Sequence, residues 1–360
     1  YGSVSFQKVN KMIDCLVFEG DLPQYKGDKK TNKVYLFSSV NSSLDWIADI
    51  KNNVQGTSSQ YYPRKNNKFE FIDGITYTET GMKEDSYQVT DDVLPAAVFC
   101  VKTDFAESSG THNTGVANMI DTMLKEMNIL TDAQKANPKV RTTVAGRPCL
   151  LFHKETADSE PVFIGKVNLN TDKAAENTFG FKEGDESWEF LNNTSDLTLF
   201  KTGDMTGWEN NIEARYPDGN TDITNVRKVF EWVHSCKGNV EKFKSEFSQY
   251  FDKDNVVFYA LITLALGMTD QRAKNMFLTR IGNGKWSFIF YDNDTLIPIN
   301  NEAVIEFLYN VEIQDTIGNK NVWNGADSEL WKLVEEAFAD DIREMYYTMR
   351  QRGIFSYDKM

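Results

Sequence analysis

The first half of the chain alternates short apolar runs with turn residues, which is the pattern typical of β-strands. The runs that fit a strand lie at 34–37, 68–71, 96–101, 140–152 and 162–169. The stretch 114–127 differs, because Val116, Ile120 and Leu124 recur at the spacing of one helix face. The stretch 171–225 is rich in Asn, Asp, Gly and Thr, so we expect long loops there.

Helical spacing dominates from residue 225 onward. It predicts helices at 226–234, 240–250 and 329–352. A further buried helix is expected to begin at a cap formed by Asp254 or Asn255 and to end at Gly267. Beyond it, two apolar strands flank Gly282-Asn283-Gly284, which is a strong signal for a β-hairpin.

This distribution predicts an α+β protein with two lobes and a cleft between them. Residues 31–225 are expected to form a β-rich N-terminal lobe and residues 226–360 a helix-rich C-terminal lobe. Residues 1–30 are interpreted as a connection from a longer chain. The absence of an initiator Met before Tyr1 supports the interpretation that the sequence is a piece of a larger protein.

The composition narrows the choice of partners. The 360 residues include 39 Lys+Arg and 53 Asp+Glu, which gives a net charge of −14. Such a surface repels phosphate backbones and anionic membranes, so we expect no nucleic-acid partner. The longest nearly apolar run, 256–268, is shorter than the roughly 20 residues that a membrane span needs, so no span is expected.

Several common catalytic motifs are absent from the sequence. It contains no GxxxxGK[ST], GxGxxG, HExxH or GxSxG pattern, which disfavours P-loop enzymes, Rossmann dehydrogenases, zincins and serine hydrolases. The four cysteines are far apart and have no metal-ligand spacing. Reduced and mostly buried thiols are the expected state.

Acidic and amide side chains concentrate around the predicted hairpin. Asp270 and Asn275 form an Asp-x-x-x-x-Asn pattern before it, and Asp292 and Asp294 form Asp-x-Asp after it. Because a hairpin returns the chain to its starting point, Asn275 and Asp292 are expected to lie side by side. In phosphoryl transfer, one carboxylate orients the acceptor while amide and carboxylate oxygens hold Mg²⁺ or Mn²⁺. The alternative is structural, with Asp270 as a helix cap and 292–294 as a surface turn.

A second polar segment could bind phosphate. It consists of a small hydroxyl-rich turn followed by two cations: Gly56, Thr57, Ser58, Ser59, Arg64 and Lys65. Backbone N–H groups, hydroxyls and nearby cations are what a polyphosphate needs when no P-loop is present. Either cation could face the phosphates, and the alternative is a plain loop with a solvated pair.

Taken together, these segments resemble the CotH family of kinase-like spore-coat proteins. The elements that carry the resemblance are, in order, Gly56-Thr57-Ser58-Ser59, Pro63-Arg64-Lys65, Val101-Lys102-Thr103-Asp104, Leu199-Phe200-Lys201 and the Asp-x-x-x-x-Asn and Asp-x-Asp pair. They extend over roughly residues 30–300. The resemblance implies a bilobal, atypical protein-kinase-like fold that binds ATP with Mg²⁺ or Mn²⁺ and phosphorylates a protein.

The resemblance also implies roles for individual residues. Asp270 would be the catalytic carboxylate, with Asn275, Asp292 and Asp294 at the metal. The turn beginning at Gly56, with Arg64 or Lys65, would bind phosphates, and Lys102 and Lys201 would assist at the nucleotide. One departure concerns residues 165–171, which stand where many relatives have a Gly-x-Tyr-x-Leu-x-Glu motif, so that the expected Glu near Asn170 is absent. Glu176, Glu183 and Glu186 are candidate substitutes for that acid.

A non-catalytic function is the alternative to the kinase. The segments 55–66 and 102–118 resemble the version of this domain found in large phage or phage-like virion proteins. On this interpretation the chain is a structural module of a tail or capsid assembly, located in the virion, with neighbouring virion proteins as its partners.

Overall fold

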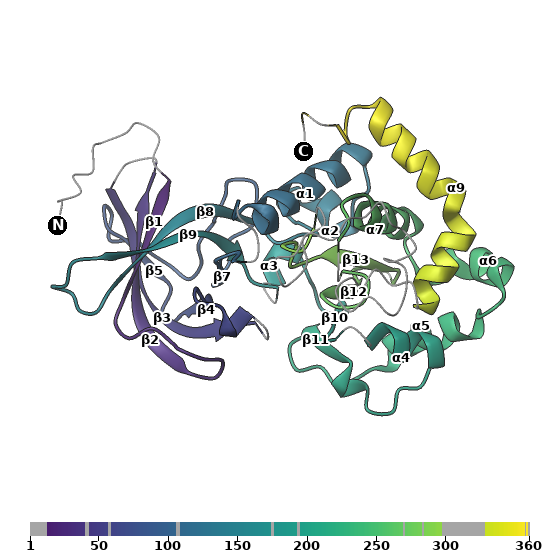
Figure 1. Cartoon of the computed structure of the whole chain (residues 1–360), viewed down its shortest axis with the longest axis horizontal. Helices are drawn as coiled ribbons and strands as arrows, with labels where there is room; N and C mark the ends of the chain where they lie inside the picture. Colours follow the sequence, from purple (N-terminus) through teal and green to yellow (C-terminus); the bar gives the residue numbers. More distant parts are fainter. Residues whose placement is uncertain are drawn as a thin grey trace. The chain divides into compact units, whose positions relative to one another are not determined.

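The chain forms two compact units in its computed structural model. The first unit is Tyr1–Thr114 with Ala145–Ala175, and the second is Gly115–Val144 with Glu176–Met360 (Figure 1). The structure describes residues 13–39, 43–56, 59–105, 109–173, 176–192, 195–268, 271–282, 284–296, 328–356 and 358. The units therefore do not follow the expected boundary at residue 225, because the second unit also takes up 176–225 and Gly115–Val144.

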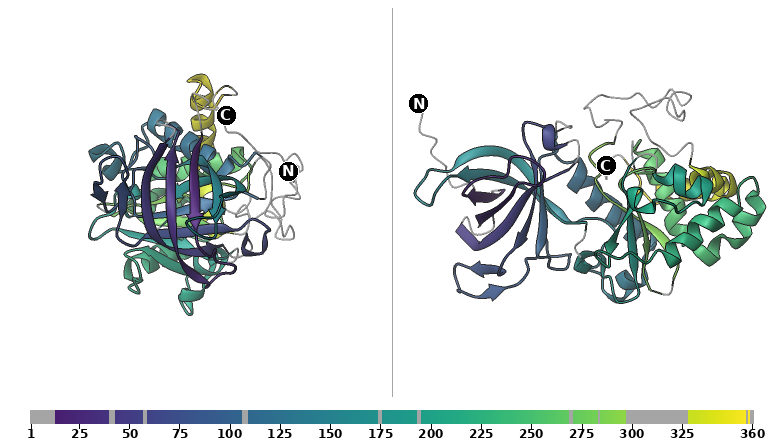
Figure 2. Two further views of the ribbon diagram at one scale, coloured as in Figure 1. Left: turned by 90° about the vertical axis from the view of Figure 1, so that its left-hand side faces the viewer. Right: turned by 90° about the horizontal axis from the view of Figure 1, so that it is seen from below.

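A single sheet with nine strands organises the first unit. The strands are β1 (Asp14–Glu19), β2 (Lys29–Ser38), β3 (Ser43–Gln55), β4 (Asn66–Phe71), β5 (Ile75–Tyr77), β6 (Lys83–Glu84), β7 (Val98–Lys102), β8 (Gly146–Lys154) and β9 (Val162–Thr171). Their order is β2-β1-β8-β9-β7-β4-β3-β5-β6, and β2 also pairs with β3. This second pairing of β2 closes seven strands into a barrel, a closure that the sequence did not predict (Figure 2).

The barrel core follows the alternation seen in the sequence. Val34 and Leu36 of β2 point inward and are fully buried, while their neighbours along the strand are more exposed. Phe69 of β4 lies opposite Phe99 of β7, with their ring centroids 5.7 Å apart. The strands at 34–37, 68–71, 96–101 and 162–169 are thus confirmed. The strand expected at 140–152 begins later, at Gly146.

Helices and a smaller sheet make up the second unit. The elements are α1 (Ala117–Met127), α2 (Asp132–Ala136), α3 (Glu176–Phe179), β10 (Glu186–Phe190), α4 (Ser195–Thr202), η3 (Trp208–Asn210), β11 (Ile212–Tyr216), α5 (Thr224–Ser235), α6 (Val240–Tyr250), α7 (Lys253–Ala265), β12 (Met276–Arg280), β13 (Trp286–Phe290) and α9 (Glu329–Gln351). Its sheet has the order β11-β10-β12-β13 and is antiparallel. No helix among the described residues is long and apolar enough to cross a bilayer.

Aromatic side chains fill the core of the second unit. Trp331 of α9 stacks on Tyr259 of α7 at 5.5 Å between ring centroids and contacts Phe288 of β13 at 5.1 Å. All three side chains are buried. Helix α7 thus lies between α9 and the β12–β13 hairpin, where rings of about 150–250 Å² each remove a large apolar area from water.

Two sequence predictions in this unit are wrong. The stretch 171–225 is not a run of loops, because it contains β10, β11 and α4. Helix α7 is capped by Asp252, whose side chain accepts a hydrogen bond from the Asn255 N–H. Asn255 instead bonds both backbone groups of Phe288, at 2.7 and 3.2 Å, and so ties α7 to β13.

Candidate functional site

The β12–β13 hairpin brings two of the predicted residues together. Met276 pairs with Phe290, so Asn275 precedes the hairpin where Asp292 follows it. Asn275 Nδ2 lies 3.4 Å from Asp292 Oδ2. Both residues have left-handed backbones, with φ of 53° and 55°, a conformation that Asn and Asp tolerate better than most residues. This strained pair at a strand end is a recurring mark of functional sites.

The other predicted residues of this region are only partly described. Asp294 is half-buried, two positions beyond Asp292. Asp270 lies outside the described residues, and so do Thr57 and Ser58 of the phosphate-binding candidate. The proposed role of Asp270 therefore rests on the sequence pattern.

Gln271, which the sequence analysis overlooked, ties the loop before β12 to the residues after β13. Its Nε2 donates to the Asp292 carbonyl at 2.9 Å and the Tyr291 carbonyl at 3.4 Å. Its own carbonyl accepts a hydrogen bond from the Tyr259 hydroxyl at 2.5 Å. Gln271 thereby fixes the spacing between the loop and Asp292, a role that no local sequence signal indicated.

Arg272 anchors the same loop to the helices. Its guanidinium is 3% exposed, bonds Thr263 and the Ala260 carbonyl of α7, and pairs with Glu335 of α9 at 2.5 Å. Trp331 donates from Nε1 to the Arg272 carbonyl at 3.0 Å, and its ring lies 5.0 Å from the guanidinium carbon. A buried cation needs such a full set of partners to avoid a large desolvation cost. The contacts of Arg272 with α7 and α9 therefore hold the loop before β12 in place.

Next to Asp292 lies a buried side chain whose polar atoms bond none of the described residues. Asn293 is 0% exposed, and among the described residues neither its Oδ1 nor its Nδ2 has a hydrogen-bond partner. Gln271 Oε1 is also buried, and it too has no partner in the part of the chain that the structure describes. A buried amide without a partner costs about 1–3 kcal/mol, so a group that bonds these atoms would recover that energy.

These atoms fit a hard divalent cation better than zinc. Among the described residues, no group of three or more His, Cys, Asp or Glu side chains comes together. The oxygen-bearing side chains of this stretch are the carboxylates of Asp292 and Asp294 and the amides of Asn275, Asn293 and Gln271. Carboxylate and amide oxygens suit Mg²⁺ or Mn²⁺, whereas zinc prefers Cys and His.

The phosphate-binding candidate in the barrel unit is packed against its own backbone. Gly56 has φ of +98°, and a Cβ there would lie 1.9 Å from Ser59 Oγ, so the turn requires glycine. Lys65 Nζ donates to the carbonyls of Gln60, in the short helix η1 (Ser59–Tyr61), and Tyr62, at 2.7 and 3.3 Å. Lys65 therefore stabilises the turn in this structure.

Arg64 bonds backbone oxygens as well. Its guanidinium nitrogens lie 3.4 Å from the Lys166 carbonyl and 3.5 Å from the Thr103 carbonyl. The guanidinium carbon lies 5.9 Å from the centroid of the Phe105 ring. In this structure, then, Arg64 joins β9 to the residues that follow β7.

The two predicted nucleotide lysines belong to different units. Lys102 is the last residue of β7 in the barrel and is 6% exposed. Lys201 lies in the last turn of α4 in the second unit and is exposed. Its carbonyl accepts a hydrogen bond from His234 at 2.7 Å.

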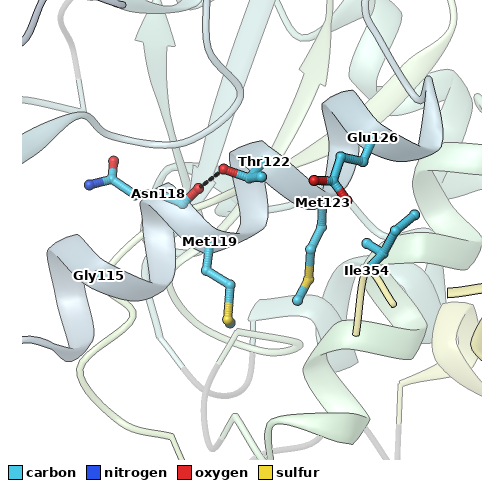
Figure 3. Close-up of a pocket in the computed structure, with 7 residues that line it drawn as sticks. All are labelled: Gly115, Asn118, Met119, Thr122, Met123, Glu126 and Ile354. Atoms are coloured by element: carbon cyan, nitrogen blue, oxygen red, sulfur yellow. Dashed lines mark hydrogen bonds between the residues drawn. The ribbon is translucent and has the colours of Figure 1, made fainter. Parts of the chain in front are cut away.

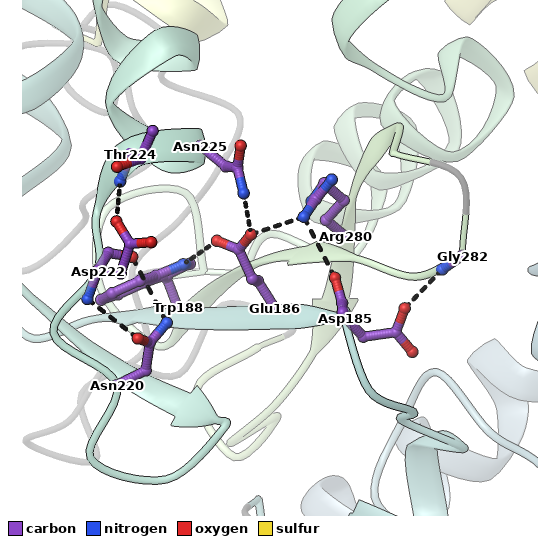
Figure 4. A network of polar contacts seen from close by, with 10 residues as sticks. Asp185, Glu186, Trp188, Asn220, Asp222, Thr224, Asn225, Arg280 and Gly282 are labelled. Carbon is purple, nitrogen blue, oxygen red and sulfur yellow. Dashed lines mark hydrogen bonds and ion pairs between the residues drawn. The ribbon is translucent and has the colours of Figure 1, made fainter.

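The three glutamates considered as substitutes for the missing acid all lie in the second unit. Glu176 and Glu183 are exposed. Glu186 is buried in a closed polar network, where it accepts from Arg280 at 2.7 Å and Asn225 at 2.6 Å and also bonds Trp188 (Figure 4). Because its two oxygens are already occupied, Glu186 serves the packing of β10 against β12 and α5.

The cysteines are not candidates for nucleophiles. All four are free thiols, and three of them are buried, as the sequence predicted. Burial raises the pKa of Cys149 to about 12 and that of Cys100 well above its usual range. A thiol that stays protonated at neutral pH is a poor nucleophile.

A separate hollow of about 390 Å³ lies along α1 (Figure 3). Its lining residues are Gly115, Asn118, Met119, Thr122, Met123, Glu126 and Ile354. Glu126 is its only titratable side chain, so the hollow contains no set of groups for catalysis.

Comparison with known proteins gives one result that covers more than half of the chain. Residues 170–359 match the family model described as CotH kinase protein. The match includes α4, the β12–β13 hairpin and the loops around it, while most of the barrel unit lies outside it. No curated protein matches the sequence.

Proposed function

Because the chain belongs to the CotH kinase protein family, we propose that it binds ATP together with Mg²⁺ or Mn²⁺ and transfers a phosphoryl group to a protein. The observation that carries this proposal is the position of Asn275 beside Asp292, next to Asn293, which is buried and has no side-chain hydrogen-bond partner among the described residues. A carboxylate beside amide oxygens is the donor set that kinases use for the metal on the phosphates.

Each residue of the second unit has a proposed role. Asp270 orients the acceptor hydroxyl and receives its proton. Asn275 and Asp292 would hold the metal through their side-chain oxygens, and Asp294 would hold a second metal or act as an orienting group. The cation, when bound, would neutralise charge on the transferred phosphate. Gln271 keeps Asp292 in place through its hydrogen bonds to the backbone of Tyr291 and Asp292.

The remaining predicted residues are proposed to contact the nucleotide. In the barrel these are the turn Gly56-Thr57-Ser58-Ser59 together with Arg64, Lys65 and Lys102, and in the second unit Lys201. Arg64 and Lys65 bond backbone carbonyls in this structure, so binding phosphate would require them to exchange these partners. Lys102 is the stronger candidate because it is a buried cation at a strand end.

Transfer of labelled phosphate from ATP tests the catalytic role. The purified chain with ATP and Mg²⁺ or Mn²⁺ is expected to label itself or a protein acceptor, and Asp270→Ala is expected to reduce labelling to background while keeping the same melting temperature. Asp218→Ala, which changes an exposed carboxylate of the same unit, is the matched control and should label like the unmodified chain. Equal labelling by Asp270→Ala would remove Asp270 from the catalytic role.

A non-catalytic structural module, such as one in a phage virion, is the second candidate. It is favoured by residues 165–171, which end in Thr171 and so lack the glutamate that the resemblance predicts there as the partner of the nucleotide lysine. The two candidates differ in nucleotide binding, because a ligand that binds only the folded state must raise the melting temperature. A melting temperature unchanged by millimolar ATP and Mg²⁺ or Mn²⁺ would favour the structural module.

A further inference from the structure

A hollow of about 260 Å³ on the barrel unit concentrates positive charge. Four of its eight lining residues are lysines, namely Lys29, Lys30, Lys51 and Lys68. One of them, Lys30, is paired with Asp28 at 3.3 Å. The chain as a whole contains 53 acidic residues against 39 basic ones, so this surface differs in sign from the protein that carries it.

The strand register places three of these lysines on the outer face of the barrel. Asn53 of β3 lies opposite Lys29 of β2 on one side and opposite Lys68 of β4 on the other, and directly opposite residues share a face. Lys51 lies two residues before Asn53 on β3, so it points to the same side. Asn52, between them, points inward and is bonded to other buried amides. We call Lys29, Lys51, Lys68 and Asn53 the lysine face.

The lysine face keeps positive charge that the barrel does not neutralise. Lys68 pairs with Asp172, which is 0% exposed, at 2.8 Å. Lys29 and Lys51 are exposed, and neither forms an ion pair with a residue that the structure describes. Glu70 is the acid that lines the hollow, and it lies opposite Lys51 in the register. The ammonium groups of Lys29 and Lys51 are therefore open to an acidic ligand.

The spacing of the lysine face favours several separate carboxylates over one small anion. Adjacent strands lie about 4.8 Å apart, which puts the Cα atoms of Lys29 and Lys68 about 10 Å apart. Because β3 pairs with both β2 and β4, its N–H groups are used in the ladders and do not converge on an anion. In an extended peptide, side chains on one face repeat about every 7 Å. Alternate acidic residues of such a peptide can therefore reach separate lysines.

The charge of the whole chain favours a short protein segment over a nucleic acid. Attraction between exposed charges is screened beyond about 8–10 Å at physiological salt. A long polyanion would extend past the lysine face and meet a protein whose net charge is −14. A short acidic segment stays within the range of the lysines and avoids most of this repulsion.

We propose that the lysine face binds a short acidic segment of another protein. Lys29 and Lys51 pair with its carboxylates, and Asn53 offers an amide N–H group between them. Lys68 contributes less, because Asp172 already neutralises it. The ion pairs are exposed, so binding is weak and decreases with added salt. The proposal does not depend on phosphoryl transfer.

Fluorescence anisotropy with the full chain and a labelled peptide of alternating glutamate and serine tests the proposal. Lys29→Gln/Lys51→Gln should weaken binding by about tenfold or more, and Lys29→Arg/Lys51→Arg should keep the affinity within about twofold. The matched control is Lys237→Gln/Lys244→Gln, which removes two exposed lysines of the second unit and gives the same net charge. It should change the affinity less than about twofold. Absence of peptide binding, or equal losses in the two Gln variants, would overturn the proposal.

The variant Glu70→Gln is expected to improve binding. Glu70 is exposed and is the acid among the lining residues, so its removal takes away repulsion of the peptide carboxylates. The affinity should rise by about twofold to fivefold. A purely structural role of the lysines predicts no such gain, and an unchanged or lower affinity would contradict binding at this face.

Competition identifies the class of ligand. Inorganic phosphate should displace the peptide no more than sodium chloride does at the same ionic strength. A single-stranded oligonucleotide with the same number of charges should bind more weakly than the peptide. Displacement by phosphate alone would indicate a small-anion site, and tighter oligonucleotide binding that depends on Lys29 and Lys51 would indicate a nucleic-acid surface. Either result would overturn the acidic protein segment as the ligand.

Discussion

The two units treat a buried asparagine in opposite ways. In the barrel, Asn52 is 1% exposed and lies in a chain of amides, accepting from Asn67 at 3.2 Å and donating to Asn32 at 3.0 Å. In the second unit, Asn293 is 0% exposed and has no partner among the described residues. The same side chain at the same depth thus belongs to the framework in one unit and, in the function that we propose, lies at the ligand site in the other.

The largest effect is expected from removing the aromatic support of the candidate site. Trp331→Ala should lower the free energy of unfolding by about 3–5 kcal/mol and also weaken ATP binding, because Trp331 holds the Arg272 carbonyl. Trp46→Ala in the barrel core, where Trp46 contacts Phe71 at 5.6 Å, is expected to cost a similar amount of stability. It should leave the affinity of the remaining folded protein unchanged. Urea unfolding measures the free energy of unfolding, and calorimetry measures the ATP affinity. Equal losses of affinity in Trp331→Ala and Trp46→Ala would show that Trp331 has no special role in supporting the candidate site.

Replacing the framework asparagine should destabilise the barrel. Asn52→Leu removes two hydrogen bonds and leaves Asn67 and Asn32 with unpaired amide groups, at an expected cost of about 1–3 kcal/mol. The urea midpoint should fall accordingly, without any change in the response to Mg²⁺. An unchanged midpoint would mean that the amide chain does not contribute to stability.

The same substitution in the second unit should have the opposite sign. Asn293→Leu removes two buried groups that have no partner among the described residues, so it is expected to raise the free energy of unfolding by about 1 kcal/mol without metal or nucleotide. It should also reduce the stabilisation that Mg²⁺ and ATP give to the unmodified chain. Thermal melts with and without both ligands measure this difference. A loss of stability like that of Asn52→Leu would show that Asn293 also belongs to the framework.

The smallest effect concerns the pH dependence of the barrel. Burial, together with a hydrogen bond to Glu19 at 2.6 Å, raises the pKa of Tyr35 from about 10 to about 12. Because the pKa in the folded state is the higher one, the stabilisation is fully present below about pH 10 and is lost as the pH rises toward 12. Tyr35→Phe should therefore make stability fall less steeply over this range. Urea midpoints at about pH 9 and 11 measure the slope, and equal slopes would contradict the effect.

The sequence predicts elements well where only one face is buried. The strand β2 and the helices α5 and α6 follow clean periodic patterns, and the structure contains them. The strand β10 was missed because all five of its residues are buried, including Glu186 and Glu189. Their charges are compensated by Arg280 and Arg215 from neighbouring strands. Such pairing depends on tertiary contacts, so a local pattern cannot reveal it.

Only the part of the candidate site that follows from the hairpin could be predicted from the sequence. The hairpin alone placed Asn275 beside Asp292, and the structure agrees. Gln271 and Asn293 could not be identified, because whether an amide is partnered depends on side chains from α7 and on the turn after β13.

The discontinuity of the barrel unit has a consequence for protein synthesis. Strands β1 and β7 leave the ribosome early, but their partners β8 and β9 follow only after the stretch Gly115–Val144 of the other unit. Until then two strand edges remain open, and open edges can pair with neighbouring chains. The strand edges of the nascent chain therefore stay exposed for a time that depends on the speed of translation. Slower translation of 115–144 would lengthen that time.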